Sequence, residues 1–318
     1  MAGILARVTG ALIIATLLSF AGRWLWAAEM LVNFRTHFAL ALILAMIVAL
    51  VMRRWRVAGF AVIGLALNLW PMYGAFFAPA PRPLANARTV RVAAFNVHVK
   101  NENLADIAAH LDSLAVDVVV LAELTPTEKA EQLAKLLPKL PHHYLAENDG
   151  LWGVAILSRW PLMAPQVATR DGVRVAARAD VDLGDRTFRL YGAHLIWPVM
   201  PKTADVRNAQ LQALGRELAE CRHACVAVGD FNVTPWSSHL RDVLKNPGVR
   251  DCAAGRGLLT TWSSRLPAVL RIRIDQCLVA GAVIVANVQV GDSVGSDHFA
   301  TINDLSIGDQ TSRVTPER

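Results

Sequence analysis

Charged residues are scarce in the first quarter of this 318-residue chain. Residues 1–78 contain no lysine and one acidic residue, Glu29, against six arginines. The whole chain carries a formal net charge of +6, so most of the excess positive charge lies in this quarter and the rest of the chain is nearly neutral. A protein that binds nucleic acid through a soluble domain carries its basic excess on that domain. The charge balance therefore does not indicate a nucleic-acid surface.

Cysteine is also scarce, with four residues in the chain. Cys221 and Cys225 flank a short Arg-His-Ala turn. Outside the cytoplasm these two residues would form a disulfide, and two buried thiols are the equal alternative. A zinc site built on Cys221, His223 and Cys225 lacks the second ligand pair that zinc sites have at the usual spacing.

Long apolar runs dominate the first quarter. They cover about residues 8–30, 36–52 and 57–77, and two charged residues interrupt the first run. A run of about 17 to 25 apolar residues suits a bilayer core, whereas a signal peptide has one short run followed by soluble sequence. We therefore expect residues 1–78 to form a transmembrane region of about three helices, and leave open whether the first segment spans.

Arginines at the segment ends predict how these helices are oriented. Arg53, Arg54 and Arg56 crowd the connection between the second and third segments, which the positive-inside rule places in the cytoplasm. The N-terminus with Arg7 is then also cytoplasmic, and the third segment leaves the bilayer on the opposite side. We expect a multi-pass protein of the inner membrane with the lipid bilayer as partner, no obligate protein partner, and a periplasmic domain after a Pro-rich linker at 79–89.

The remaining sequence alternates short β-branched runs with amphipathic helical patterns, and it has no repeat or low-complexity run. Predicted strands outnumber predicted helices, and several neighbouring strands look like hairpins. The run at 118–121 is apolar throughout, as in a strand that is buried on both faces. These patterns favour one α/β domain at 90–305, in which two mixed sheets pack face to face with helices outside. Residues 306–318 are expected to be a C-terminal tail.

Several predicted strands end in a carboxylate, an amide or an imidazole. Each of these side chains alone is explained by a turn or by a hydrogen-bonded core histidine. Together they indicate a site, because charged groups at the tips of buried strands are costly unless paired or bound to a metal, and α/β proteins commonly build sites at strand ends. The residues are Asn96, Glu123, His194, Asp230, Asn232, Asp275, Asp297 and His298.

The chemistry of this set matches phosphoester hydrolysis. That reaction needs a hard divalent cation, which oxygen ligands hold, and Asn96, Glu123 and Asp297 supply such oxygens. It also needs a group that activates or orients the attacking water, for which a carboxylate with a neighbouring amide is suited. Two histidines are suited to contact the phosphate oxygens and the leaving group.

Short motifs around these residues resemble those of the endonuclease/exonuclease/phosphatase (DNase I-like) superfamily, and they occur in the family's order over about residues 90–303. That superfamily includes abasic-site endonucleases, inositol phosphatases and neutral sphingomyelinases. The motifs are Ala94-Phe-Asn-Val, Leu121-Ala-Glu-Leu, Gly153-Val-Ala-Ile-Leu-Ser-Arg-Trp-Pro, Gly192-Ala-His-Leu, Gly229-Asp-Phe-Asn, Thr261-Trp262, Arg273-Ile-Asp and Ser296-Asp-His-Phe.

The resemblance implies a four-layer α/β sandwich with a site for Mg²⁺ or Mn²⁺. It implies that Glu123 is the main metal ligand, with Asn96 and Asp297 nearby. The sequence departs from the family at two positions. Ala122 stands where the family often has Gln, and His98 stands where some members have an acidic residue, which argues against a second metal ligand on that side.

The same resemblance implies the catalytic residues. Asp230 would activate or position the attacking water, and Asn232 would orient the phosphate. Asp275 would hold His298 against the phosphate as a carboxylate–imidazole pair. His194 would donate to the phosphate or the leaving group, and its presence where abasic-site endonucleases have Tyr favours the DNase and sphingomyelinase type of site.

Three functions remain as hypotheses. The first is a membrane-anchored phosphoesterase that hydrolyses a phosphomonoester or phosphodiester such as a lipid or envelope phosphate, which the nearly neutral domain and the apolar loop 195–201 favour. The second is a membrane-tethered endonuclease or exonuclease on DNA or RNA, for which several basic phosphate contacts are expected. The third is a non-catalytic binding module, which the complete set of site residues disfavours.

Overall fold

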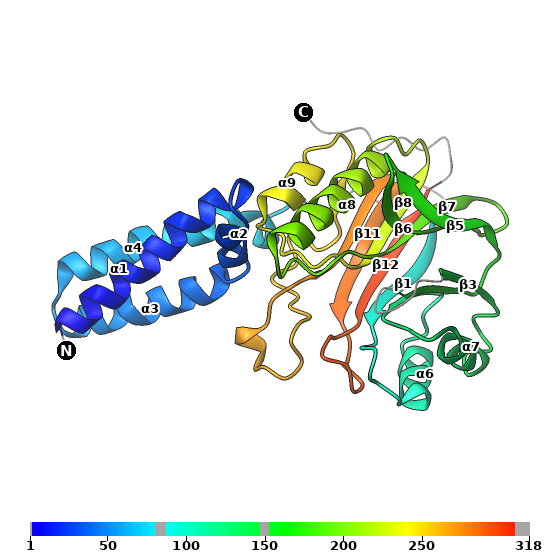
Figure 1. Cartoon of the computed structure of the whole chain (residues 1–318), viewed down its shortest axis with the longest axis horizontal. Coiled ribbons are helices and arrows are strands. Elements are labelled where there is room, and N and C mark those ends of the chain that lie inside the picture. The colour runs from blue at the N-terminus through cyan, green and yellow to red at the C-terminus, as the bar shows by residue number, and fades with distance from the viewer. Residues whose placement is uncertain (1, 80–86, 147–152, 309–318) are drawn as a thin grey trace.

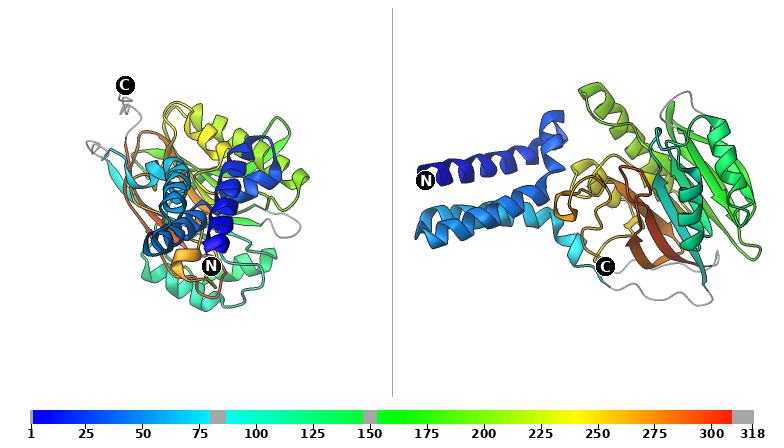
Figure 2. Two further views of the ribbon diagram at one scale, coloured as in Figure 1. Left: turned by 90° about the vertical axis from the view of Figure 1, so that its left-hand side faces the viewer. Right: turned by 90° about the horizontal axis from the view of Figure 1, so that it is seen from below.

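The chain folds into an N-terminal helical bundle that projects from one side of an α/β domain (Figure 1). The computed structural model describes residues 2–79, 87–146 and 153–308. Most of the expected linker at 79–89 and of the expected tail at 306–318 lies outside these residues. The right-hand view of Figure 2 shows the same end-to-end arrangement from below, and the left-hand view looks along the bundle with the domain behind it.

The N-terminal bundle, residues 2–77, consists of three long helices that run side by side, with short helices at the end that meets the domain (Figure 1). Large apolar side chains such as Leu44 and Phe60 are exposed on its outside. A helix that is apolar on all sides is typical of a membrane span. The helices are α1 (Ala2–Ser19), η1 (Phe20–Arg23), α2 (Trp26–Val32), α3 (Arg35–Val51), α4 (Trp55–Leu69), η2 (Trp70–Met72) and α5 (Tyr73–Phe76).

Two helical stretches of this bundle are long and apolar enough to cross a membrane, Ala2–Arg23 and Trp55–Phe76, with 22 residues each. Helices α2 and α3 reach this length and apolarity only when they are taken together, and the chain bends by 61° between them. The described residues therefore contain two such helices, or three if the bent pair is one span. The sequence predicted about three, and the difference lies in the second predicted segment, 36–52, where α3 alone has 17 residues and so lies at the short end of the range that suits a bilayer.

Two mixed sheets form the centre of the α/β domain. In the part of the chain that the structure describes, each sheet has six strands, in the orders β11-β12-β1-β2-β4-β3 and β5-β6-β7-β8-β10-β9. The strands are β1 (Arg88–Asn96), β2 (Val118–Ala122), β3 (His142–Ala146), β4 (Val154–Ser158), β5 (Leu162–Arg170), β6 (Val173–Asp182), β7 (Thr187–His194), β8 (Ala224–Asp230), β9 (Arg250–Asp251), β10 (Asp275–Gly281), β11 (Val283–Val290) and β12 (Thr301–Ile307).

The sheets pack face to face through small apolar side chains, and helices cover both outer faces. Val92 and Val120 of the first sheet belong to the same buried cluster as Val226 and Val228 of the second. Helices α6 (Leu104–Ser113) and α7 (Thr127–Lys135) bury apolar side chains against the first sheet. Helices α8 (Pro201–Ala219) and α9 (Ser238–Leu244) do so against the second. This confirms the predicted four-layer α/β sandwich.

Two disulfides lie in the second sheet region. Cys221 is bonded to Cys225. The sequence left open whether these two residues form a disulfide or are buried thiols, and the structure has the disulfide. Cys252, directly after β9, is bonded to Cys277 of β10, the strand that pairs with β9; the sequence did not predict this pair. The described residues contain no free cysteine.

Candidate active site

The register of the strands brings the predicted residues together at one end of both sheets. In the first sheet, Asn96 at the end of β1 lies beside Ala122 of the parallel strand β2, so Glu123 follows directly. In the second sheet, Asp230 at the end of β8 pairs with His194 of the parallel strand β7 and with Asp275 of the antiparallel strand β10. Glu123 has a φ of 60°, in the left-handed region, where the chain leaves β2.

The Asp230 carboxylate is the centre of this group. Its Oδ2 accepts a hydrogen bond of 3.1 Å from the Asn96 amide. The same oxygen lies 3.8 Å from Nε2 of His194 and 3.7 Å from Nε2 of His298. Its Oδ1 accepts a hydrogen bond of 2.9 Å from the backbone N–H of Asn232. The end of β8 therefore contacts groups from both sheets through one side chain.

The pKa of Asp230 is raised to about 7, mainly because the carboxyl is buried. The charge of His298 opposes this shift, and the charge of Asp275 adds to it. A carboxyl group whose pKa lies near neutrality is suited to take up a proton from an attacking water molecule. The position and the pKa of Asp230 are those that a general base needs, and its catalytic role stays a prediction.

His298 is held by a buried carboxylate. Its Nδ1 lies 2.9 Å from Oδ2 of Asp275, and Thr261 donates a hydrogen bond of 2.5 Å to that same oxygen. Burial lowers the pKa of His298, but the charges of Asp275 and Asp230 and the hydrogen bond to Asp275 outweigh it and raise the pKa to about 10. The imidazole is therefore a cation at neutral pH, suited to bind a phosphate oxygen.

Glu123 is the more accessible carboxylate of the site. Its Oε1 accepts a hydrogen bond of 2.9 Å from the Asn96 amide, and its Oε2 accepts one of 3.0 Å from the backbone N–H of Val99. The Asn96 amide nitrogen thus bridges Glu123 and Asp230, while the Asn96 oxygen accepts a hydrogen bond from His98 N–H. In this arrangement Asn96 presents its nitrogen to both carboxylates, whereas a metal ligand would present its oxygen.

The donor set fits a hard divalent cation. Two carboxylates, Glu123 and Asp230, converge on one amide, and oxygen ligands of this kind hold such cations. A second group, Asp230, Asp275 and His298, has ligand atoms within 4.8 Å of one another. Its members are buried, and two of them, Asp275 and His298, are hydrogen-bonded to each other, so Glu123 with its partly exposed side chain is the better entry point for an ion.

Asp297 lies at the edge of the site. Its Oδ2 accepts a hydrogen bond of 3.0 Å from the Trp262 indole, and its charge contributes to the raised pKa of His298. The structure therefore places Asp297 beside the histidine, with its side chain engaged by Trp262. Asn232 is likewise engaged, since its side-chain amide donates a hydrogen bond of 2.9 Å to the Leu195 carbonyl and so ties β8 to the loop that follows β7.

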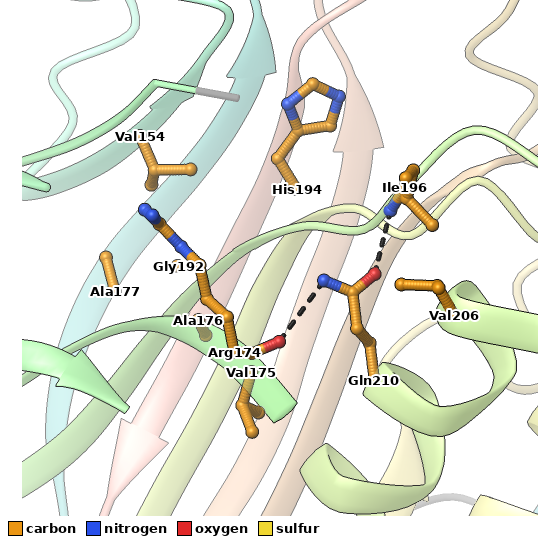
Figure 3. A pocket seen from close by; sticks show the side chains of 10 residues that line it. All are labelled: Val154, Arg174, Val175, Ala176, Ala177, Gly192, His194, Ile196, Val206 and Gln210. Carbon is orange, nitrogen blue, oxygen red and sulfur yellow. Dashed lines mark hydrogen bonds between the residues drawn. The ribbon is translucent and has the colours of Figure 1, made fainter. Parts of the chain in front are cut away.

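A cavity of about 160 Å³ opens beside His194 (Figure 3). Burial and the nearby charge of His298 lower the pKa of His194 to about 3, so its imidazole is neutral. Arg174 and Gln210 supply the other polar lining of the cavity, and Gln210 accepts a hydrogen bond from Ile196 N–H and donates one to the Arg174 carbonyl. Arg174 was not among the residues predicted from the sequence, and it is one of two arginines in β6, so its residue type gave no specific signal.

Comparisons with known proteins agree with this geometry. A sequence model of the endonuclease/exonuclease/phosphatase family matches residues 93–298. No curated protein sequence matches the chain. Similar solved structures include an endonuclease/exonuclease/phosphatase from Beutenbergia cavernae, with 20% identity and a TM-score of 0.56 over 70% of this chain and 72% of that one.

Two further solved structures are similar over almost their whole length. A humanised TDP2 of D. rerio has 18% identity and a TM-score of 0.58 over 68% of this chain and 98% of that one. The 3′ phosphatase NExo from Neisseria, bound to a product DNA hairpin, has 20% identity and a TM-score of 0.54 over 67% of this chain and 98% of that one. The family match covers most of the sequence, and the chain belongs to the endonuclease/exonuclease/phosphatase family of hydrolases that act on phosphoester bonds.

Proposed function

We propose that this protein is a membrane-anchored phosphoesterase that depends on Mg²⁺ or Mn²⁺ and hydrolyses a lipid phosphate or another phosphoester at the membrane face. The observation that carries the proposal is the direct attachment of the site's own loops to the N-terminal bundle. Trp26 of α2 donates a hydrogen bond of 2.7 Å to the Pro198 carbonyl, in the loop that follows His194. His37 of α3 donates one of 2.9 Å to the Leu270 carbonyl.

The loops that touch the bundle also expose apolar side chains, which we call the apolar rim. Trp197 is 61% exposed and Met200 is 56% exposed in the loop after His194, and Val269 is 64% exposed in the short helix η3 (Ala268–Leu270). In Figure 1 this helix, in orange, lies on the side of the domain that faces the bundle. A bilayer around the bundle would meet the apolar rim, so a lipid substrate would reach the site without crossing water.

The side chains of the site have complementary tasks in this proposal. Glu123 would hold the divalent cation, which supplies charge stabilisation to the phosphoryl oxygens. Asn96 and Asp297 would join it as ligands only after turning away from their present partners, since Asn96 now presents its nitrogen to Glu123 and Asp297 accepts a hydrogen bond from Trp262. Asp230 takes up the proton of the attacking water at Oδ2. His298 binds a phosphate oxygen as a cation, and neutral His194 donates to the phosphate or the leaving group. Asn232 orients the phosphate while it keeps the ends of β7 and β8 together.

The proposed topology has three spanning helices, α1, α3 and α4. The N-terminus and the connection with Arg53, Arg54 and Arg56 lie at the same end of the bundle, away from the domain (Figure 1). This placement supports a cytoplasmic location for that end and a periplasmic location for residues 90–305. The two disulfides support the same compartment, because disulfides persist in oxidising surroundings. An alkaline phosphatase reporter fused after the last residue should be active, and a reporter there that works only in the cytoplasm would overturn this topology.

A membrane-tethered nuclease is the second candidate. The similar structures of NExo and of a D. rerio TDP2 contain product DNA, which favours it. The nearly neutral charge of residues 90–305 disfavours it, since duplex binding relies on several cationic phosphate contacts.

The test uses the full chain in lipid nanodiscs with Mg²⁺ or Mn²⁺. Phosphate release from lipid phosphates is compared with nicking of plasmid DNA, with Glu123→Ala and Asp230→Ala as inactive controls. We expect lipid hydrolysis that both substitutions and EDTA abolish. Plasmid nicking without lipid hydrolysis would replace the lipid proposal by the nuclease, and equal signals from wild type and both variants on every phosphoester would refute catalysis.

A further inference from the structure

The one acidic residue among residues 1–78, Glu29, reaches from the N-terminal bundle into the α/β domain. The residue is 2% exposed. Its Oε1 accepts a hydrogen bond of 2.6 Å from Nη2 of Arg207 on α8 and another of 2.9 Å from the Ser237 hydroxyl. Its Oε2 lies 3.5 Å from Nε2 of His239 on α9. Glu29 therefore contacts the domain at three residues, one on α8 and two at the start of α9.

Arg207 carries this contact to the active site. It is 1% exposed, and its Nη1 donates a hydrogen bond of 2.7 Å to the backbone carbonyl of Asn232. A buried guanidinium needs a compensating carboxylate, and the structure supplies it from Glu29. The position of Arg207, and with it the position of the Asn232 backbone, thus depends on a residue of the N-terminal bundle.

The loop that receives these contacts is the one that holds Asp230. Asn232 has a φ of 50°, in the left-handed region that asparagine adopts more readily than most other non-glycine residues. Its backbone N–H donates a hydrogen bond to Oδ1 of Asp230. Further along, Thr234 donates a hydrogen bond of 3.0 Å to Asn33 of the bundle. Residues 230–237 are therefore held at Asn232, Thr234 and Ser237, directly or through Arg207, by groups of the N-terminal bundle.

We propose that Glu29 is a positioning residue of the active site: through Arg207 it fixes the backbone at Asn232 and thereby the orientation of the Asp230 carboxylate. The N-terminal bundle then completes the catalytic domain in addition to anchoring it. This inference rests on the proposed phosphoesterase function for its kinetic consequence, while its structural consequence is independent of the substrate. A misplacement of about 1 Å at a catalytic group costs on the order of a hundredfold in rate, so a small relaxation of this loop would be measurable.

The experiment compares Glu29→Gln and Glu29→Ala with wild type in the full chain in nanodiscs. Arg23→Gln is the matched control, because Arg23 forms another ion pair between bundle and domain, with Asp242, that is exposed and lies outside residues 230–237. Activity on a lipid phosphate is measured with amide hydrogen exchange of peptides covering residues 229–237. Peptides from β6 serve as the reference for exchange.

Glu29→Ala should lower kcat by about tenfold or more with a smaller change in KM, and should speed exchange at 229–237 while β6 stays protected. Glu29→Gln should have a kcat and an exchange rate at 229–237 between those of wild type and Glu29→Ala, since its amide oxygen still accepts hydrogen bonds. Arg23→Gln should match wild type in both measurements. The inference is overturned if both Glu29 variants keep wild-type exchange at 229–237, or if they change kcat no more than Arg23→Gln does. An inactive wild type would refute the phosphoesterase function, and the exchange data would still decide the positioning role.

Discussion

The Nδ1 atom of His298 lies 2.9 Å from Oδ2 of Asp275, and this pair joins the two sheets of the sandwich. Asp275 is the first residue of β10 in one sheet, and His298 precedes β12 in the other. Both residues are buried. The pair therefore fixes the orientation and the charge of the imidazole, whose Nε2 faces Asp230 across 3.7 Å.

Replacing Asp275 by asparagine should change how stability depends on pH. The pKa of His298 is about 10 in the folded protein, whereas an unfolded histidine has a pKa of about 6.5. Because the folded value is higher, the stabilisation is fully present below about pH 6.5 and is lost as the pH rises toward about 10. Thermal unfolding of the full chain in detergent with EDTA should show this decline for wild type and a flatter curve for Asp275→Asn.

The control for that measurement is Asp112→Asn, an exposed carboxylate on α6 that lies away from the site. It should keep the wild-type decline. An Asp275→Asn protein whose stability still falls as steeply above neutral pH would contradict the assignment of the shift to this pair.

Asp230→Asn should lower kcat by about 10² to 10⁴, the usual contribution of a general base, without lowering the melting temperature. The asparagine keeps the shape of the side chain and removes a charge that burial disfavours. Steady-state kinetics on the best phosphoester and thermal unfolding measure the two effects. The control is Asp242→Asn, since Asp242 is a partly exposed carboxylate on α9. A near-wild-type kcat for Asp230→Asn would exclude Asp230 from the reaction.

Glu123→Ala should weaken metal binding by about 100-fold or more. Substitution of residues that only support the metal ligands already lowers metal affinity by about 10- to 100-fold. Binding also stabilises the folded state, by about 2.7 kcal/mol at a free metal concentration of 100 times Kd. Titration of Mn²⁺ or Mg²⁺ followed by melting temperature reads this out without any substrate. Glu128→Ala, on the exposed surface of α7, should bind metal like wild type, and equal stabilisation of Glu123→Ala would remove Glu123 from the metal site.

The double substitution of Trp197 and Met200 by serine should reduce hydrolysis of a lipid phosphate in vesicles by about tenfold, because burial of a large apolar side chain contributes about 1.5 to 3 kcal/mol. Hydrolysis of a soluble aryl phosphate should change little. Leu136→Ser provides the matched control, since Leu136 is a comparably exposed apolar residue at the end of α7. A parallel loss on both substrates would mean that the apolar rim supports the fold of the site rather than contact with lipid.

The order of short motifs and the hydrophobic patterns were sufficient to predict the α/β sandwich and the strand ends at which chemistry would be found. Strand β2 is a continuous apolar run that Glu123 follows, and β8 is an apolar run that ends in Asp230; this signal is local. The sequence did not predict that Asp230 would be the shared centre, because that follows from the register of β7, β8 and β10 and from the contact between the sheets.

The composition of the first 78 residues predicted apolar helices, and Glu29 was then merely a charge that interrupted an apolar run. The tertiary structure placed it on the separate helix α2, against an arginine 178 positions further along the chain. Local periodicity carries no information about which distant side chain compensates a buried charge. The packing of the bundle on the domain decides that, because burial makes an unpaired carboxylate too costly to leave without a partner.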